Sequence, residues 1–352
     1  MSTYDGVADL PLTIDGYALD TLSRQVSSGF ERVSTVIRIQ GGGEEGAGED
    51  VTYTADEHHK QAERGPELPL AGEWTFASFS EHFGGLDLFP AGAPEMDVFR
   101  NYRRWGFESA ALDLALRQAG TSLAAAVDRG PEPVRFVVSS RMGEPPTIEP
   151  VTRRLARYPG LRFKLDATPD WDDGLIEGLI ATGAVDSIDF KGLYRGTIVD
   201  AETDAGFYRR IAEAFPDAWL EDPDLEPDDA RDALRPFEDR ITWDAPIHST
   251  VDILAMPVLP RTVNLKPSRF GSVRALFDAY DFCDARGMGA YGGGQFELGV
   301  GRGQIQYLAA LFHADEPNDI APAGYDALDP EPGLPESPLD PDPEPTGFRR
   351  RS

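Results

Sequence analysis

The chain contains little cysteine and no long apolar segment. Cys283 is the only cysteine among 352 residues, so an intrachain disulfide and a cysteine-based zinc site are both excluded. No apolar run approaches the roughly 18 residues that a membrane-crossing helix needs. Residues 1–20 lack the basic start and the apolar core of a secretory signal peptide. These absences predict a cytoplasmic protein.

Positive charge is scarce as well. Asp and Glu number 61 against 33 Lys and Arg, which gives a formal net charge of −28. A surface this acidic repels phosphate backbones and anionic lipids, which argues against nucleic acid or a membrane as a partner. An acidic surface also suits a salty cytoplasm, where ions screen the self-repulsion, and a halophilic source is therefore a hypothesis. Lysine is rare: the chain has only Lys60, Lys164, Lys191 and Lys266. The last three lie inside apolar segments.

The chain length suits a barrel of roughly 200–250 residues together with a second domain. Residues 31–54 alternate like a pair of strands, and residues 97–128 have the period of an amphipathic helix. The segment 60–95, rich in Gly, Pro and aromatic residues, is expected to form a long loop. From residue 133, seven short apolar segments are each followed by a helix-like stretch, and an eighth strand is expected near Asp319. This alternation predicts a closed parallel α/β barrel.

The expected domains follow from this pattern. Residues 1–132 are predicted to form an α+β domain and residues 133–325 the barrel. Residues 326–352 are rich in Pro and Asp, and their composition allows two interpretations. The segment is either a disordered tail or a strap that Leu334, Leu339 and Phe348 pin across the first domain.

Charged residues late in the predicted barrel strands form the candidate site, because the carboxyl ends of the strands build the functional mouth of such a barrel. Asp189, Glu221 and Asp244 lie on three successive strands and offer the hard oxygen ligands that suit Mg²⁺. Lys164 lies on the preceding strand and Lys266 on the next one. A metal stabilises the charge that develops on a carboxylate when its α-proton leaves, and a lysine of lowered pKa can take that proton. Two lysines on opposite sides permit removal on one side and return on the other.

The ordered run of motifs resembles the enolase superfamily, in the branch of muconate-lactonizing enzymes and o-succinylbenzoate synthases. The similarity covers roughly residues 30–325. WLEDP, ITWDA and VNLKPSRFGS are similar to the family strands that carry two metal ligands and a base. GGGQFELGVGR resembles a glycine-rich strand that carries a glutamate. IRIQGGGEEGAGE and RWGFESAALDLALRQAGTSLA are similar to parts of the family's capping domain.

The resemblance implies a modified TIM-type (β/α)7β barrel with an N-terminal α+β capping domain. It implies Mg²⁺, or Mn²⁺ as a substitute, on Asp189, Glu221 and Asp244, with Lys164 and Lys266 as the acid/base pair. The implied activity is an isomerase or lyase that forms an enediolate from a small-molecule carboxylate: a cycloisomerase, a racemase or epimerase, or an o-succinylbenzoate synthase-like dehydratase. A dipeptide epimerase is disfavoured, because residues 319–321 lack the second aspartate of the Asp-x-Asp in that group. By the same analogy, the chain is expected to form a homo-oligomer.

Two departures from the family pattern leave alternatives open. The family's Lys-x-Lys strand is matched either by Arg162-Phe163-Lys164 or by Lys164-Leu165-Asp166. The first is preferred, because Arg162 would then be the nearby cation that lowers the pKa of Lys164. The second would place Asp166 at the position of the base. Lys191 stands where many relatives have asparagine, and it either contacts substrate or pairs with a carboxylate.

Three more residues are candidates for substrate binding, beside Arg162 and Lys191. Glu297 lies in the glycine-rich strand, although it could instead cap the helix that follows. Trp74 and Phe76 lie in the expected loop, which by analogy closes over the site. If Asp166 stands at the position of the base, the alternative function is a non-catalytic metal-binding barrel. A metal-dependent hydrolase is disfavoured, because histidine ligands are nearly absent from the strand ends.

Overall fold

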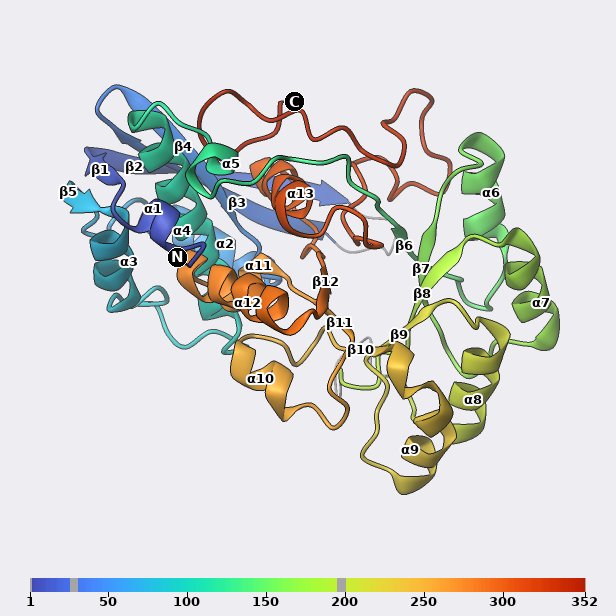
Figure 1. Cartoon of the computed structure of the whole chain (residues 1–352). Helices are drawn as coiled ribbons and strands as arrows, with labels where there is room; N and C mark the ends of the chain where they lie inside the picture. Colours follow the sequence, from blue (N-terminus) through green and yellow to red (C-terminus); the bar gives the residue numbers. More distant parts are fainter. Residues whose placement is uncertain (1, 26–30, 195–200, 352) are drawn as a thin grey trace.

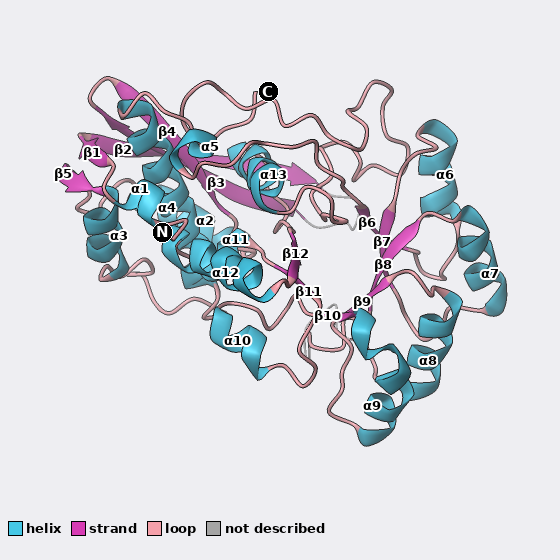
Figure 2. Ribbon diagram, viewed as in Figure 1, coloured by secondary structure: helices cyan, strands magenta, loops and turns pink. Residues whose placement is uncertain are grey.

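The computed structural model describes residues 2–25, 31–194 and 201–351. Figure 1 shows the N-terminal part, in blue and cyan, beside the barrel, and Figure 2 shows the helices that flank both groups of strands. The N-terminal part holds a three-stranded antiparallel sheet in the order β2 (Gly16–Gln25), β3 (Glu31–Gly41), β4 (Glu44–Asp50). A second pair joins β1 (Pro11–Ile14) to β5 (Gly72–Thr75). The helices are α1 (Asp5–Ala8), α2 (Ala55–Arg64), α3 (Phe76–Gly84), α4 (Phe99–Gln118) and α5 (Leu123–Ala126).

Helix α4 lies directly on strand β4, and two glycines make this approach close. A Cβ on Gly46 would lie 2.2 Å from the carbonyl oxygen of Ala110, and one on Gly48 would lie 2.2 Å from that of Gly106. Because no other residue fits at these positions, the glycine-rich strand β4 packs into the core as well as forming a hairpin with β3. The capping part therefore has the α+β architecture that the sequence predicts.

The prediction of a long loop over residues 60–95 is wrong for much of that segment. Helix α2 reaches into it, and β5 and α3 follow inside it. Thr75 accepts a hydrogen bond from the backbone N–H of Ser78, and the Ser78 side chain accepts one from the Thr75 N–H, which is a capping box. Phe76, Phe79 and Phe83 then recur at helical spacing and are all fully buried. The aromatic residues belong to the capping core.

The barrel strands alternate with helices, as predicted. The strands are β6 (Val138–Arg141), β7 (Phe163–Asp166), β8 (Val185–Asp189), β9 (Trp219–Glu221), β10 (Ile241–Thr242), β11 (Thr262–Asn264) and β12 (Gly289–Tyr291). The helices are α6 (Glu149–Arg157), α7 (Asp173–Thr182), α8 (Ala205–Ala214), α9 (Asp228–Leu234), the 3₁₀ helix Arg235–Arg240, α10 (Thr250–Ala255), α11 (Pro267–Phe270), α12 (Val273–Arg286) and α13 (Val300–Phe312). Strands β6 to β10 form one parallel sheet in sequence order, and β11 pairs with β12.

Hydrogen bonds close these two sheets into a barrel. The N–H of Asn264 donates to the Trp243 carbonyl at 3.1 Å, which joins β11 to the end of β10. On the other side, Asp319 donates to Gly292 and Val137 donates to Asn318, each at 2.8 Å. Residues 318–319 thus form a short eighth strand between the end of β12 and the start of β6. The closed parallel barrel and the strand near Asp319 are confirmed.

The C-terminal segment is ordered over the described residues and crosses both parts of the molecule (Figure 1). Leu339 pairs with Val134 at the start of the barrel, and its side chain is buried. Phe348 is fully buried and packs edge-on against Trp105 of α4. The segment is thus a strap that buried contacts hold, at the start of the barrel through Leu339 and on α4 through Phe348.

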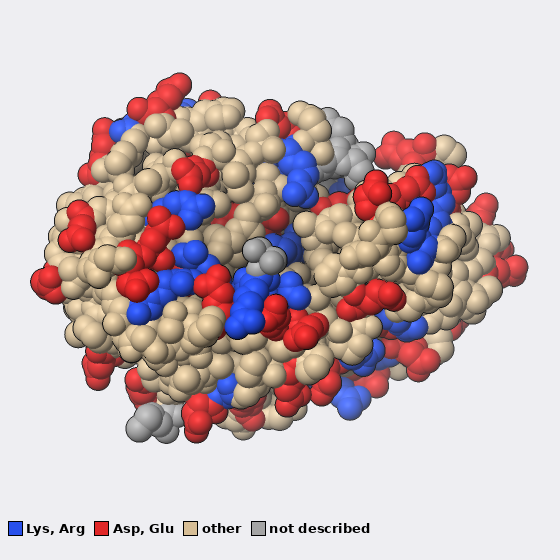
Figure 3. All heavy atoms as spheres, turned by 90° about the horizontal axis from the view of Figure 1, so that it is seen from above, with Lys and Arg blue, Asp and Glu red and all other residues tan. Residues whose placement is uncertain are grey.

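The surface carries both signs of charge, with Asp and Glu in excess. Figure 3 shows small groups of Lys and Arg among the more numerous acidic side chains. Many of these basic side chains form exposed ion pairs, such as Arg38 with Glu45. Each such pair contributes about 0–1 kcal/mol to the free energy of unfolding. Within the described residues, no helix is both long enough and apolar enough to cross a membrane.

Candidate active site

Three buried carboxylates meet at the carboxyl ends of β8 and β9. Asp189 ends β8, Glu221 ends β9 and Asp222 follows it, and all three side chains are fully buried. Each offers an oxygen within 4.8 Å of the other two. Asp189 and Glu221 are in register in the parallel sheet, so their side chains point to the same side. Buried, closely spaced oxygen donors fit a divalent ion of the Mg²⁺ type.

Asp244 lies beside these carboxylates but is held by cations. Its carboxylate is 2.9 Å from the Lys266 ammonium and 2.9 Å from the Arg269 guanidinium, and it accepts a 3.2 Å hydrogen bond from the Tyr194 hydroxyl. Burial alone would raise the pKa of Asp244, but the charges of Arg269 and Lys266 hold it well below its usual range. Asp244 is therefore a carboxylate at neutral pH, available as a ligand once a cation replaces these contacts.

Asp222 holds the start of the Asp244 loop in place. It has a positive φ of 49°, and its two oxygens accept 2.8 Å hydrogen bonds from the N–H groups of Asp244 and Ala245. Burial, followed by the charges of Asp244 and Asp189, raises the pKa of Asp222 to about 7. Its hydrogen bonds thus couple the end of β9 to the end of β10.

Lys164 lies beneath the carboxylates, enclosed on every side. Its ammonium contacts Glu221 and lies 3.1 Å from Asp189 and 3.6 Å from Asp319. Burial would lower the pKa of Lys164, yet the charges of Glu221 and Asp189 outweigh burial and raise it well above the ordinary value. Arg162, the cation expected beside it, lies elsewhere.

Arg162 is the first correction to the predicted site. Its guanidinium pairs with Asp186, at 2.9 Å from Nε, and with the carbonyl of Gly183, at the amino end of β8. Arg162 directly precedes β7 and lies about 7 Å nearer the amino end of the barrel than Lys164. Its partner Asp186 is the extra residue where the pairing shifts from Phe163 with Val185 to Lys164 with Ser187. The structure does not bring Arg162 to the carboxylates.

Trp74 and Phe76 are the second correction. Trp74 lies in β5, pairs with Leu12 of β1 and stacks on His82 with ring centroids 4.8 Å apart. Phe76 is fully buried and contacts the ring of Tyr4. Both rings stabilise the far side of the capping part, and Figure 1 shows β5 at the edge of the molecule, away from β8 and β9.

Lys191 lies at the edge of the carboxylate cluster, two residues after Asp189. Its ammonium contacts Asp189, lies 3.4 Å from Asp166 and lies over the Tyr194 ring at 5.0 Å from the centroid. Its φ is +54°, a left-handed conformation that is uncommon for lysine. The Lys191 N–H donates to Asp189 at 3.0 Å, which fixes this turn.

Glu297 lies in a loop that is held by two residues of the capping part. Buried Arg32 donates to the carbonyls of Gln295 and Phe296, at 2.9 and 3.2 Å. Glu49 accepts from the N–H groups of Leu298, Gly299 and Gly301 at the start of α13, at 2.7, 3.0 and 2.9 Å. Helix α13 is thus capped by a carboxylate from the other part of the molecule. Glu297 itself accepts from the Gln295 N–H at 2.7 Å and does not cap the helix.

Several buried polar atoms around the mouth lack a hydrogen-bond partner among the described residues. They are both side-chain atoms of Asn264, Nε2 of Gln295 and Oε2 of Glu297. Buried polar groups are nearly always paired with protein, water or ligand. Below them, the fully buried Tyr291 hydroxyl donates to Glu221. The loop after β12 therefore presents unused hydrogen-bonding capacity beside Lys266, whose Cε would lie 2.5 Å from a Cβ on Gly293.

Two family models cover most of the chain. One is described as the N-terminal domain of a "Domain of unknown function (DUF8230)" and matches residues 5–126, and the other as its C-terminal domain and matches residues 130–327. The chain belongs to the DUF8230 family. No curated protein has a significantly similar sequence.

The fold of this DUF8230 chain is similar to the folds of solved members of the enolase superfamily and related enzymes. A dipeptide epimerase from Methylococcus capsulatus, complexed with Mg, is 16% identical with a TM-score of 0.67, over 88% of this chain and 90% of that one. A member of the enolase superfamily from Listeria innocua is 18% identical with a TM-score of 0.64, over 88% and 86%. Muconate cycloisomerase from Pseudomonas fluorescens is 18% identical with a TM-score of 0.60, over 88% and 87%. The predicted resemblance is confirmed for the fold.

The DUF8230 structure also contains site residues that the sequence prediction left out. Asp222 belongs to the predicted set of charges at the strand ends but was given no role of its own, and Arg269, three residues after Lys266, was left out. Tyr291 and Glu49 gave no local signal, because their partners lie 70 and about 250 residues away along the chain.

Proposed function

We propose that this protein is a Mg²⁺-dependent enzyme, an isomerase or lyase, that removes a proton α to the carboxylate of a small organic acid. The supporting observation is the buried cluster of Asp189, Glu221 and Asp222, with Asp244 beside it, at the carboxyl end of a barrel. Charges so costly to bury are typical of a site that binds metal and substrate. The superfamily fold supports the same reaction class.

The ligand set we propose is Asp189, Glu221 and Asp244, with Mn²⁺ as a substitute ion. Asp222 fixes the Asp244 backbone, and the Tyr291 hydroxyl fixes Glu221, so both orient ligands rather than bind the ion. The bound ion would supply positive charge to the substrate carboxylate as the α-proton leaves.

The protein's own part is to position the acid and to move the proton. Lys266 lies at the end of β11 with its ammonium 2.9 Å from Asp244. Its partner is a second amine on the other side of the ligand set, and the sequence predicts Lys164 for this role. One amine accepts the α-proton and the other can return a proton to the opposite side, which permits racemisation, cycloisomerisation or dehydration. The side-chain amides of Asn264 and Gln295, which have atoms without a hydrogen-bond partner, can bind further polar groups of the acid.

Hydrogen exchange tests this proposal. The protein is incubated in D₂O with Mg²⁺ and a panel of α-substituted carboxylic acids, while mass gain and product formation are followed. Exchange that requires Mg²⁺ and is lost in Lys266→Ala supports the function. The control is Lys60→Ala, which changes an exposed lysine of α2.

A second measurement keeps metal binding apart from turnover. Calorimetry of Mg²⁺ with the wild-type protein and with Asp189→Asn reports the ion alone. Binding by the wild type without exchange of any acid in the panel would instead support the non-catalytic metal-binding barrel. Absence of Mg²⁺ binding would contradict both functions.

A further inference from the structure

The three lysines of the site differ in how far they are enclosed. The Lys164 side chain is 2% exposed, Lys266 is 8% exposed and Lys191 is 16% exposed. Lys164 is enclosed by Asp189, Glu221 and Asp319, so its ammonium is already surrounded by carboxylates. Lys191 has the greatest access to the mouth.

The strand register places Lys164 deeper than the metal ligands. Asp166 is the Cα partner of Asp189, whereas Lys164 pairs with Ser187. Two residues along a strand correspond to about 7 Å, so Lys164 starts a full layer below Asp189. Lys191 follows Asp189 and starts above that level.

Lys191 and Lys266 also lie on separate sides of the cluster. Lys191 follows β8 and Lys266 follows β11, and strands β9 and β10 lie between them in the barrel. Lys191 contacts Asp189, and Lys266 contacts Asp244. A small acid placed over the carboxylates would therefore meet an ammonium group from each side.

We propose that Lys191, and not Lys164, supplies the second amino group that faces the substrate, opposite Lys266. This inference rests on the proposed function and names which lysine performs half of it. In that step the Cα–H bond breaks, its electron pair moves into the substrate carboxylate, and the proton forms a new N–H bond on the neutral amine of one lysine. In the return step, an N–H bond of the other lysine breaks, and its proton forms a new Cα–H bond with the electron pair held in the enediolate. Lys164 is then a positioning residue, whose charge keeps Asp189 and Glu221 together.

Amine labelling tests the geometry without a substrate. The chain has only four lysines, and Lys60, 45% exposed, is an internal reference. With limiting acetic anhydride and Mg²⁺ present, mass spectrometry of peptides should show Lys60 modified first, then Lys191, and Lys164 last. Modification of Lys164 as fast as or faster than Lys191 would overturn the inference.

Variants test the chemistry with an acid that exchanges in the panel above. Lys191→Met is expected to slow α-proton exchange of the enantiomer whose proton faces Lys191 by about 10²- to 10⁴-fold, while exchange of the other enantiomer by Lys266 and Mg²⁺ binding persist. The swap of Asp166→Lys with Lys191→Asp keeps the ion pair and moves the amine to β7. Aspartate also tolerates the positive φ at position 191. The swap should exchange about tenfold faster, or more, than Lys191→Met alone.

The outcomes separate this inference from the function on which it rests. Undiminished exchange of both enantiomers of the acid in Lys191→Met would show that Lys191 is not the second amine, while the proposed function stands. No exchange by the wild-type protein with any acid would contradict the proposed function, while labelling would still report which lysine faces the mouth.

Discussion

The two ends of the barrel carry the same kinds of charged residue in opposite circumstances. At the carboxyl end, Lys164 and Asp189 are buried in a network of ion pairs. At the amino end, Arg162 and Asp186 form a pair in which the arginine is 38% exposed. Both aspartates belong to β8, three residues apart. A buried charge is costly unless it is paired or bound, whereas an exposed pair contributes little either way. The free-energy cost of burying the charges at the carboxyl end thus supports this end as the candidate site, independently of any motif.

The largest expected effect comes from removing one buried cation. Lys164→Met leaves Asp189 and Glu221 without their shared ammonium, so the free energy of unfolding should fall by about 3–5 kcal/mol. The matched change at the other end, Arg162→Met, should cost less than about 1 kcal/mol. Urea denaturation of both variants measures the difference. Equal losses would show that the two ends do not differ in this way.

Metal addition should stabilise one end only. Mg²⁺ at about 100 times its dissociation constant should raise the free energy of unfolding by about 2.7 kcal/mol. The gain should vanish in Asp189→Asn and persist in Asp186→Asn, which changes the exposed pair of the same strand. Thermal unfolding with and without Mg²⁺ measures it. A gain that survives in Asp189→Asn would place the ion elsewhere.

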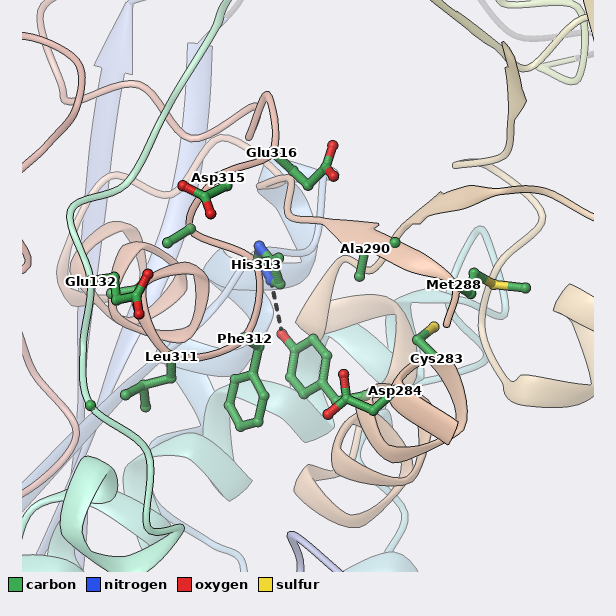
Figure 4. Close-up of a pocket in the computed structure, with 15 residues that line it drawn as sticks. Glu132, Cys283, Asp284, Met288, Ala290, Leu311, Phe312, His313, Asp315 and Glu316 are labelled. Carbon is green, nitrogen blue, oxygen red and sulfur yellow. Dashed lines mark hydrogen bonds between the residues drawn. The ribbon is translucent and has the colours of Figure 1, made fainter. Parts of the chain in front are cut away.

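The amino end has its own titratable group, His313, beside a hollow of about 320 Å³ (Figure 4). One ring nitrogen of His313 lies 2.6 Å from Asn318 Oδ1 and the other 3.4 Å from the Tyr280 hydroxyl. Burial lowers the pKa of His313 to about 4. A histidine with a depressed pKa stabilises the fold above its unfolded pKa of about 6.5, and this stability is lost as the pH falls towards the folded value.

The wild type should therefore lose about 2 kcal/mol of unfolding free energy from this group between pH 7 and pH 5. Because the carboxylates titrate as well, the measured quantity is the difference in pH dependence between the wild type and His313→Gln. Mg²⁺ should not alter that difference, since His313 lies at the other end. Identical pH profiles for the two proteins would show that His313 protonates freely in the folded state.

A smaller effect is expected where the capping part grips the carboxyl end. Glu49→Gln places an amide among backbone N–H groups that now donate to a carboxylate, which should cost about 1–3 kcal/mol. Glu44→Gln, on the exposed start of the same strand, is the control and should be neutral. Guanidinium unfolding measures both. A neutral Glu49→Gln would mean that water caps α13 equally well.

The sequence predicted what depends on local pattern. Alternating apolar segments predicted the barrel. Charges at the ends of those segments predicted a carboxylate cluster, in which Asp189 and Glu221 meet with Asp222. Asp244 lies beside this cluster, paired with Lys266 and Arg269. Arg162 was misplaced because it precedes β7 and lies about 7 Å nearer the amino end than Lys164, where it meets Asp186, an extra residue in β8 that no local pattern shows. Trp74 was misplaced because the same aromatic composition occurs in a loop over a substrate and in a strand and helix that pack into a core.

What the sequence could not predict are contacts between distant segments. The Tyr291 hydroxyl reaches Glu221 across the barrel. Phe348 reaches Trp105 in the capping part. Such pairs depend on the closed barrel and on the path of the strap, which have to be known before either contact can be inferred.

The hydrogen bonds of Arg32 and Glu49 to the loop after β12 have a consequence for folding during synthesis of the chain. Glu49 is separated by 249 residues from Leu298, its first backbone partner in that loop. At about 5–20 residues per second, a ribosome needs roughly 12–50 s to make the intervening chain. Throughout that interval, a glutamate and an arginine destined for complete burial have no loop to hold. The capping part therefore finishes folding only after the barrel has been translated, although it leaves the ribosome before the barrel does.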